Sequence, residues 1–396
     1  MKQISKYLQS VALMTPGITP YVIGGLQRHS FNLTKYLARR GVQVDLYHTS
    51  FSEPQKIDAL DGMSEQEKAN IVSIAIPWES DRYIGHYLRA LRKFSRNAFE
   101  IYKARPQVDC IIGKSLTAWE FVEAKRRGEL LPPIGINFHG YEVFQQRPTA
   151  RTKLEAAMLR PSFLRNASGA DFVFSYGGKI TKIIEEKMHI PTAKIIEIPG
   201  GIDPVMKLEA PPVTGKRRKF VFLGRYERRK GIDELNKAIA ANPHWVDRCE
   251  FIFIGDIPPK CRLNFPNLSY LGEIRDPAEI QSRLATADIL LCPSHSEGMP
   301  NVILEAMAAG LAILATDVGA VSLLVTPANG ILLATSTPGG IANAIEIFLI
   351  MPTTTLNEMK AHSHDHVANF FWPEIVDRTI TALSGVIAQS HENANA

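Results

Sequence analysis

Apolar, β-branched runs alternate with helical patterns along almost the whole chain of 396 residues, and this alternation limits the folds open to it. Strand-like runs such as 71–77, 134–139 and 312–316 are separated by helical patterns such as 26–40 and 152–167. Strands that alternate with helices of this length form βαβ units around a parallel sheet. We therefore expect an α/β fold.

The pattern starts a second time near residue 219, which indicates two doubly wound domains. The length agrees, at roughly 150 residues a domain, and the 45% hydrophobic content can fill two cores. The segment 203–218 is rich in proline and shows no periodicity, as a linker does. We expect one domain over 1–203, a second over 204–372, a final helix over 373–388 and a disordered tail over 389–396.

Two glutamates, eight positions apart, stand in the string 294–310, which reads Ser-His-Ser-Glu-Gly-Met-Pro-Asn-Val-Ile-Leu-Glu-Ala-Met-Ala-Ala-Gly. Glu305 lies in an apolar stretch, where a carboxylate is costly unless hydrogen bonds reach it, and ribose hydroxyls could donate them. The helix that begins near Asn301 offers free N–H groups that suit diphosphate or sugar oxygens. The alternative is that Glu297 is an ordinary acid at a helix start and that Glu305 is exposed.

A basic string, Phe-Leu-Gly-Arg-Tyr-Glu-Arg-Arg-Lys-Gly over residues 222–231, directly follows the first strand of the second domain. Arg225 and Lys230 could stabilise the negative charge that develops on a departing nucleoside diphosphate. The alternative is a solvated basic turn, which is our expectation for Arg228 and Arg229.

Two weaker signals come from the first domain. Gly24 and Gly25 open the first helical pattern, where glycine lets a ligand approach the backbone, although a plain turn explains them as well. His139 ends a predicted strand, a place where histidine is more often structural than functional.

The acid pair, with its flanking strings Glu-Gly-x-Pro-Asn and Glu-Ala-Met-Ala-x-Gly, resembles the signature of retaining glycosyltransferase family 4. The basic string matches the Gly-Arg-x-x-x-x-Lys-Gly pattern of that family. The resemblance implies the GT-B fold, two Rossmann-like domains facing across a cleft. It also implies a retaining hexosyltransferase that moves a sugar from a nucleotide sugar, with UDP favoured, to a glycan or glycolipid hydroxyl. Bacterial cell-surface polysaccharide or lipopolysaccharide synthesis is the implied setting.

The resemblance further assigns roles to residues. The implied catalytic residues are Arg225 and Lys230 at the diphosphate, with Glu297 and His139 at the transferred sugar. The implied donor-binding residues are Gly24, Gly25, Gly224, Ile274, Gly298, Met299, Pro300, Asn301 and Glu305, of which Glu305 would hold the ribose. A last helix from Phe371-Trp372 would cross back to the first domain. The chain departs from the family at Ala320 and Leu323, where Gly and Glu are usual.

No metal and no cofactor is expected, since the chain has no Asp-x-Asp to hold a divalent ion on the diphosphate and the nucleotide sugar is a substrate. The four cysteines show no metal-ligand spacing, which favours a reduced, cytoplasmic protein.

Charge is uneven between the halves: residues 1–200 carry 28 Lys and Arg against 19 Asp and Glu. A basic amphipathic helix predicted over 82–105 could lie on the anionic inner leaflet of the plasma membrane. It could equally be a solvated helix packed on its own sheet. No nucleic-acid-binding module is recognisable. The functional alternatives are a nucleotide-sugar epimerase on the same fold and a non-catalytic nucleotide-sugar binding protein.

Overall fold

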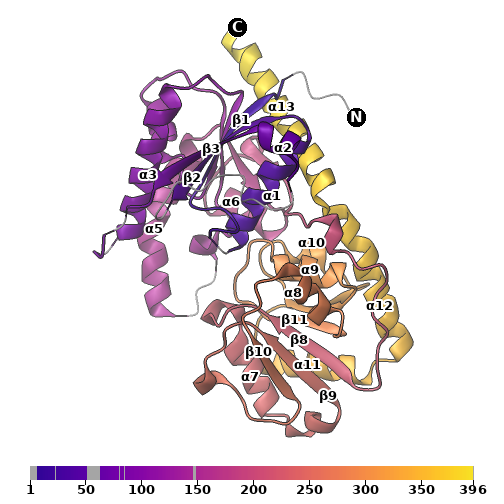
Figure 1. Cartoon of the computed structure of the whole chain (residues 1–396). Helices are drawn as coiled ribbons and strands as arrows, with labels where there is room; N and C mark the ends of the chain where they lie inside the picture. Colours follow the sequence, from indigo (N-terminus) through magenta and orange to yellow (C-terminus); the bar gives the residue numbers. More distant parts are fainter. Residues whose placement is uncertain are drawn as a thin grey trace.

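The computed structural model describes residues 7–22, 24–50, 63–79, 81–83, 85–145 and 149–395. They form two α/β domains, each around its own parallel sheet, with the C-terminal helix returning from the second domain to the first (Figure 1). The predicted fold class is therefore confirmed.

The first domain is built on a seven-stranded parallel sheet in the order β3-β2-β1-β4-β5-β6-β7. Its strands are β1 (Ser10–Thr15), β2 (Gln43–Ser50), β3 (Ile71–Pro77), β4 (Cys110–Lys114), β5 (Ile134–Asn137), β6 (Phe172–Ser175) and β7 (Ile195–Glu197). We did not predict β7, because three residues are too few to carry a pattern. The strand order reverses between β1 and β4, and ligands of such sheets bind at this switch point.

Helices cover both faces of this sheet. They are α1 (Gly25–Arg39), α2 (Glu65–Ala69), α3 (His86–Lys103), α4 (Trp119–Arg126), α5 (Ala150–Gly169) and α6 (Lys179–Glu186). Alternate residues of each strand point to opposite faces, so the domain has two cores. One core lies under α3, α4, α5 and α6, and the other lies under α1 and the C-terminal helix.

The second domain repeats the design around a six-stranded parallel sheet in the order β10-β9-β8-β11-β12-β13, with its switch point between β8 and β11. The strands are β8 (Arg218–Leu223), β9 (Cys249–Ile254), β10 (Leu268–Gly272), β11 (Ile289–Cys292), β12 (Ala312–Thr316) and β13 (Gly330–Leu333). The helices are α7 (Ile232–Ala240), α8 (Pro277–Leu284), α9 (Asn301–Ala308), α10 (Val321–Leu324), α11 (Pro338–Ile350) and α12 (Thr353–His366).

The C-terminal helix α13 (Trp372–Asn395) lies on the first domain, where Ile375, Val376 and Leu383 join the core under α1. The expected disordered tail is wrong for residues 389–395, which continue the helix because no glycine or proline ends it. The chain crosses between the domains twice, and the two crossings lie side by side: Ile202 N–H donates to Phe370 O (2.9 Å) and Trp372 N–H donates to Ile202 O (3.1 Å).

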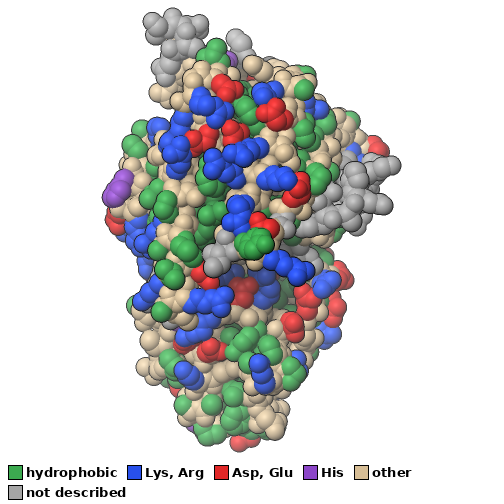
Figure 2. Space-filling model, turned by 90° about the vertical axis from the view of Figure 1, so that its left-hand side faces the viewer, with side chains coloured by type: hydrophobic (Ala, Val, Ile, Leu, Met, Phe, Trp, Pro, Cys, Tyr) green, Lys and Arg blue, Asp and Glu red, His purple; other side chains and the backbone are tan. Residues whose placement is uncertain are grey.

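The face around α3 is less basic than the sequence indicated. Figure 2 views the side of the molecule on which α3 lies, and Lys and Arg side chains there are interspersed with Asp and Glu. The ion pairs are Arg89–Asp81, Lys93–Glu79, Arg96–Glu120, Lys103–Glu100 and Arg105–Asp45. The helix begins at His86, so the first residues of the segment 82–105 precede it. Folding brings in acids from outside the segment, which a local count of charges could not include.

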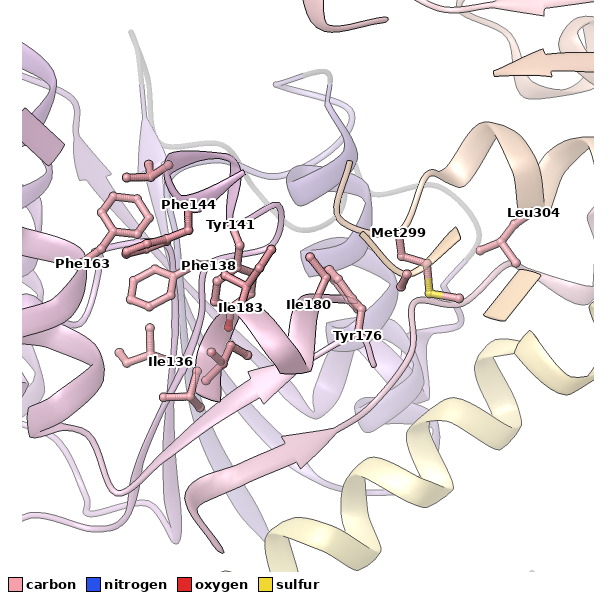
Figure 3. Packing of buried hydrophobic residues seen from close by; sticks show 14 of the residues in the cluster. Ile136, Phe138, Tyr141, Phe144, Phe163, Tyr176, Ile180, Ile183, Met299 and Leu304 are labelled. Carbon is pink, nitrogen blue, oxygen red and sulfur yellow. The ribbon is translucent and has the colours of Figure 1, made fainter. Parts of the chain in front are cut away.

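Apolar packing continues from one domain into the other. Met299, from the second domain, belongs to the same buried cluster as Tyr176 and Ile180 of the first (Figure 3). Among the described residues no single helix is long and apolar enough to cross a membrane. The bent pair α11–α12 passes that test by composition, and both helices contribute to the core of the second domain.

Candidate active site

The loops after the central strands of both sheets meet at the junction of the domains. Gly24 and Gly25 follow β1, His139 follows β5, the basic string follows β8, and Glu297 follows β11. The carboxyl ends of the parallel strands point toward this junction, as expected for ligand sites of doubly wound sheets. In Figure 2 the surface is hollowed between the domains, with acidic and basic side chains inside.

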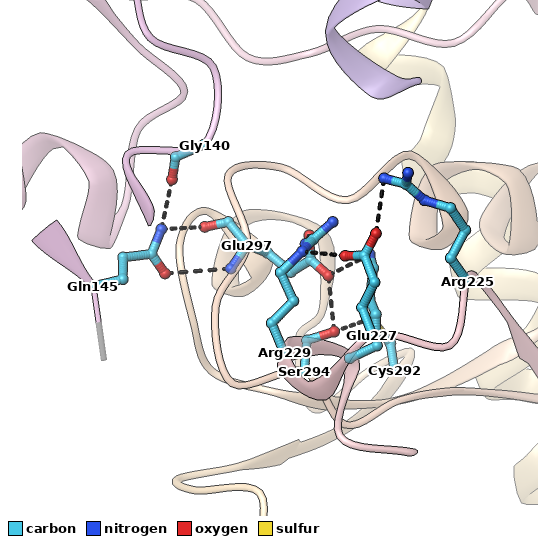
Figure 4. Close-up of polar contacts among 9 residues, drawn as sticks. Gly140, Gln145, Arg225, Glu227, Arg229, Cys292, Ser294 and Glu297 are labelled. Carbon is cyan, nitrogen blue, oxygen red and sulfur yellow. Dashed lines mark hydrogen bonds and ion pairs between the residues drawn. The ribbon is translucent and has the colours of Figure 1, made fainter. Parts of the chain in front are cut away.

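Glu297 is buried and lies at the centre of a cluster of charges (Figure 4). Its carboxylate accepts from Lys230 Nζ at 2.7 Å, from Ser294 Oγ at 2.8 Å and from Arg229 Nη1 at 3.3 Å. Burial alone would raise the pKa of this carboxyl, but Lys230 and Arg229 reverse that effect and hold the pKa below its usual value. Two cations therefore face one ionised acid at a site shielded from water.

Arg225 lies at the edge of this cluster. Its side chain is 70% exposed and its Nη2 pairs with Glu227 at 2.9 Å. Glu227 also accepts from Arg229 Nε at 2.7 Å, so Glu227 joins Arg225 to the cluster (Figure 4). Lys230 thus lies directly beside Glu297, whereas Arg225 reaches the site through an intermediate acid.

The expectation of a solvated basic turn holds for Arg228, whose side chain is 39% exposed, but is wrong for Arg229. Arg229 is partly buried and lies between Glu297 and Glu227. Arg228 pairs with Glu234 on α7 and also contacts His295. Glu234 is close in the sequence, whereas His295 and Glu297 are 67 and 68 residues away from the arginines that they contact, so the sequence contained no local sign of these two contacts.

Glu305 is buried on α9 and pairs with Arg28 from α1 of the other domain. This confirms that the carboxylate has a polar partner, as its apolar surroundings require. The expected role at the ribose stays a prediction. The sequence analysis gave Arg28 no role, although it lies three positions after Gly25.

His139 lies in the first domain against the second. Its backbone φ is +68°, and its Nδ1 is hydrogen-bonded to the Tyr176 hydroxyl. Burial, followed by repulsion from Lys114, lowers the pKa of His139 to about 3, so the ring is neutral at physiological pH. When Tyr176 O–H donates to Nδ1, the ring proton lies on Nε2. A Cβ built on Gly25 would stand 3.2 Å from that Nε2, so the ring faces the start of α1.

One of the predicted glycines, Gly298, is needed for close approach between the domains, because a Cβ there would come within 2.4 Å of His139 O. A Cβ on Gly25 would make only an ordinary contact with Asn301 Nδ2, at 3.7 Å. The loop 297–300 therefore packs directly on the loop that carries His139. Met299, at the same place, accepts from Gly200 N–H through its Sδ at 2.9 Å.

The remaining predicted donor-binding residues occupy the loop edges of the second sheet. Pro300 caps α9, Asn301 is its first residue, Gly224 directly follows β8, and Ile274 follows β10. The departure at Ala320 does not remove support from the site, because Ala320 N–H donates to Gly298 O at 2.8 Å. A backbone bond can be made by any residue other than proline, so the substitution is tolerated.

Two further buried side chains, Lys114 and His29, lie next to His139, and the sequence analysis did not predict them. Lys114, at the end of β4, has its Nζ 3.2 Å from His29 Nδ1, and both side chains are buried. The His29 ring lies edge-on to His139 at 5.8 Å between centroids. Burial lowers the pKa of Lys114 to about 7. Among the described residues, no group of three or more His, Cys, Asp or Glu side chains could hold a metal ion.

Two family models match the chain, one on each domain. The model described as Glycosyltransferase Family 4 matches residues 23–205, and the model described as Glycosyl transferases group 1 matches residues 217–350. The first covers the loops of Gly24 and His139, and the second covers those of Lys230 and Glu297.

Curated relatives match over shorter stretches. A protein named for teichuronic acid biosynthesis, the glycosyltransferase TuaC of Bacillus subtilis, is 35% identical over 129 residues, which cover 33% of this chain and 32% of the relative. The phosphatidyl-myo-inositol mannosyltransferase of Mycolicibacterium smegmatis is 34% identical over 138 residues, 32% of this chain and 35% of the relative. The chain thus matches about a third of the length of these relatives.

Solved structures match over nearly the whole chain. The sucrose-phosphate synthase of Thermosynechococcus elongatus superposes with a TM-score of 0.75 at 20% identity, covering 96% of this chain and all of that one. HepE of Anabaena in complex with UDP gives 0.67 at 18% identity, covering 96% and 100%. WaaG, a glycosyltransferase involved in lipopolysaccharide biosynthesis, gives 0.66 at 17% identity, covering 95% and 100%. These likenesses establish the GT-B fold.

Proposed function

Because the chain belongs to the glycosyltransferases whose family 4 and group 1 domains make up its two halves, we propose that it transfers a sugar from a nucleotide sugar to a hydroxyl of a glycan or glycolipid. The observation that carries the proposal is the buried cluster of Lys230, Arg229 and Glu297 between the two switch points. A departing diphosphate gains negative charge, and cations fixed in a dry site stabilise that charge without reorganisation.

We propose transfer with retention at the anomeric carbon. Glu297 is paired with Lys230 and Arg229, which weakens it as a nucleophile. In the proposed reaction the bond from the anomeric carbon to the diphosphate oxygen breaks, and the acceptor oxygen bonds to the same face of that carbon. The acceptor proton passes to the departing phosphate. His139, neutral and with its proton on Nε2, would donate a hydrogen bond to a sugar hydroxyl.

A UDP-sugar is the proposed donor. The likeness to HepE, whose structures contain UDP and UDP-glucose, supports a uridine nucleotide. Glu305 would accept from the ribose hydroxyls in place of Arg28, and the start of α9 would face the donor phosphates or sugar. No metal enters this scheme, since Lys230 and Arg229 supply the positive charge.

The proposed acceptor is a cell-surface glycan or glycolipid, made at the cytoplasmic side of the membrane. Relatives named for teichuronic acid and phosphatidyl-myo-inositol glycosylation support this setting. The pairing of the α3 cations with acids leaves a smaller net charge for lipid binding than the sequence indicated. Sedimentation with anionic vesicles at low salt tests membrane contact, and absence of binding would rule it out.

A donor screen tests the reaction itself. The protein is incubated with UDP-glucose, UDP-GlcNAc, UDP-galactose and GDP-mannose, and released nucleoside diphosphate is measured with and without a chelator. We expect UDP release that the chelator leaves unchanged. An epimerase would interconvert UDP-glucose and UDP-galactose without releasing UDP, and a binding protein would bind without turnover. Either result would replace the present proposal.

A further inference from the structure

One side chain joins the two halves of the candidate site. Gln145 belongs to the first domain, directly after the short 3-10 helix Glu142–Phe144, and is buried. Its Nε2 donates to Gly140 O at 2.6 Å and to Glu297 O at 2.6 Å. Its Oε1 accepts from Glu297 N–H at 3.2 Å (Figure 4).

Several contacts join the domains, among them the bond from Lys179 N–H to Gly319 O (3.0 Å), but the contact of Gln145 reaches the residue at the centre of the charge cluster. A carboxamide that pairs with both the N–H and the C=O of one residue fixes the position and orientation of the backbone at that residue, as a neighbouring strand would. The Arg28–Glu305 ion pair and the Gly200–Met299 bond touch side chains of the second domain. Gln145 alone of these three groups holds the backbone from which the Glu297 carboxylate extends.

The bond from Gln145 Nε2 to Gly140 O connects Gln145 to a second loop. Gly140 directly follows His139, so the same amide group holds the His139 loop and the Glu297 loop. All three groups are buried or nearly so, and a buried amide left without partners is costly. The three bonds therefore fix the separation of the two loops in the arrangement of the domains that the structure shows.

We infer that Gln145 is a positioning residue that couples closure of the domains to the placement of Glu297 opposite His139. The inference rests on the proposed function, because it treats these two residues as facing one transferred sugar. Gln145 does not touch the reacting atoms. It acts through the backbone of Glu297, so its loss should lower turnover rather than weaken nucleotide binding by the second domain.

Two variants of Gln145 separate positioning from a general effect on folding. Gln145→Ala removes all three bonds, and a displacement of about 1 Å at a reacting group can cost roughly a hundredfold in rate. We expect kcat to fall roughly tenfold to a hundredfold, with the dissociation constant of UDP changed by less than about threefold. The matched control is Gln281→Ala, which loses a similar half-buried bond to Met206 O (3.0 Å) far from the cleft. The control should keep wild-type kcat.

The second variant, Gln145→Glu, should make kcat depend on pH in a way that a purely structural role of Gln145 would not produce. Its carboxylate keeps an acceptor for Glu297 N–H but places an oxygen against the two carbonyls of Gly140 and Glu297. Protonation restores one donor, and such surroundings raise the pKa of a carboxyl. Its kcat relative to wild type should rise as the pH is lowered from 8 to about 6. A flat ratio, as expected for Gln145→Ala, would overturn the inference.

A distance measurement tests, independently of turnover, whether Gln145 holds the two domains together. Spin labels are attached at Leu130→Cys and Ile350→Cys, two exposed sites on different domains, in a Cys261→Ser background. We expect Gln145→Ala, but not Gln281→Ala, to shift the distribution with UDP toward longer distances. If the wild type turns over a donor while Gln145→Ala keeps its kcat and its distances, the inference is wrong. If no donor is turned over at all, the proposed function fails, and the distances still show whether Gln145 controls closure.

Discussion

Replacing Lys230 by methionine tests the buried charge cluster most directly. The change keeps an unbranched apolar side chain one atom shorter and removes the ammonium that lies 2.7 Å from Glu297 Oε1. Glu297 would remain buried with Arg229 at 3.3 Å and Ser294 at 2.8 Å. Breaking a buried ion pair by removing one partner costs about 3–5 kcal/mol. Because two partners remain here, we expect Lys230→Met to lower the free energy of unfolding by about 2–3 kcal/mol at pH 7.

The pH dependence follows from the sign of the pKa shift. In the wild type the pKa of Glu297 lies below its usual 4.5, so this group stabilises the fold above that pH and loses the contribution as the pH falls through the lowered value. Without Lys230, burial is the larger effect and the pKa rises above 4.5. The carboxyl then costs stability at neutral pH, and the cost falls as it becomes protonated. The difference between wild type and variant should therefore be largest at pH 7 and shrink toward pH 4.5.

Denaturant unfolding between pH 4.5 and 7.5 measures this difference, and kcat is measured alongside. Lys360→Met is the control, since Lys360 pairs with Asp288 at 2.9 Å in a more deeply buried site of the same domain. Both variants should lose stability, but only Lys230→Met should lose turnover, by about 10²–10³. A loss below about 0.5 kcal/mol that does not vary with pH would refute the reasoning on burial. Equal losses of kcat in both variants would refute the role at the leaving group.

Three further predictions concern the groups around His139. Gly298→Ala should abolish turnover while the second domain still binds UDP in calorimetry, because the added Cβ would lie 2.4 Å from His139 O; unchanged kcat would contradict that contact. Tyr176→Phe removes the hydroxyl that fixes the His139 tautomer, and should lower kcat by roughly tenfold; NMR of ¹⁵N-labelled histidine should show a mixture of tautomers, and a single unchanged tautomer would refute the assignment. Lys114 has its pKa lowered to about 7, so between pH 7 and 10 the unfolded state binds more protons and stability rises with pH. Lys114→Met should therefore raise the free energy of unfolding most at or below pH 7, with the gain vanishing near pH 10; a gain independent of pH would show that Lys114 carries no buried charge.

The strands were predictable from the sequence to within a few residues, because buried parallel strands are continuous apolar runs with clear ends. Residues 71–77, 312–316 and 330–333 were predicted with the observed bounds. The short strand Ile195–Glu197 and the helical end of the chain were missed, since one has too few residues and the other has a polar composition typical of tails.

The candidate site was predictable only in part. Lys230 and Glu297 stand in recognisable strings, and the structure places them in contact. Gln145 and Arg28 carry no local signal, because a glutamine after a short turn or an arginine in a first helical turn is ordinary in any chain. Their partners are 152 and 277 residues away.

The sequence by itself predicted the two parallel sheets and the loops that carry the charged residues, because the strands and helices follow from local patterns in the chain, whereas the strand orders and switch points came from the structure. Only the tertiary structure decided which charges meet. It partly buried Arg229 beside Glu297, left Arg225 exposed, and paired much of the basic segment near α3 with acids. The physical reason is that a charge in a folded protein is set by its neighbours in space, and in two domains that close on one another those neighbours come from distant parts of the chain.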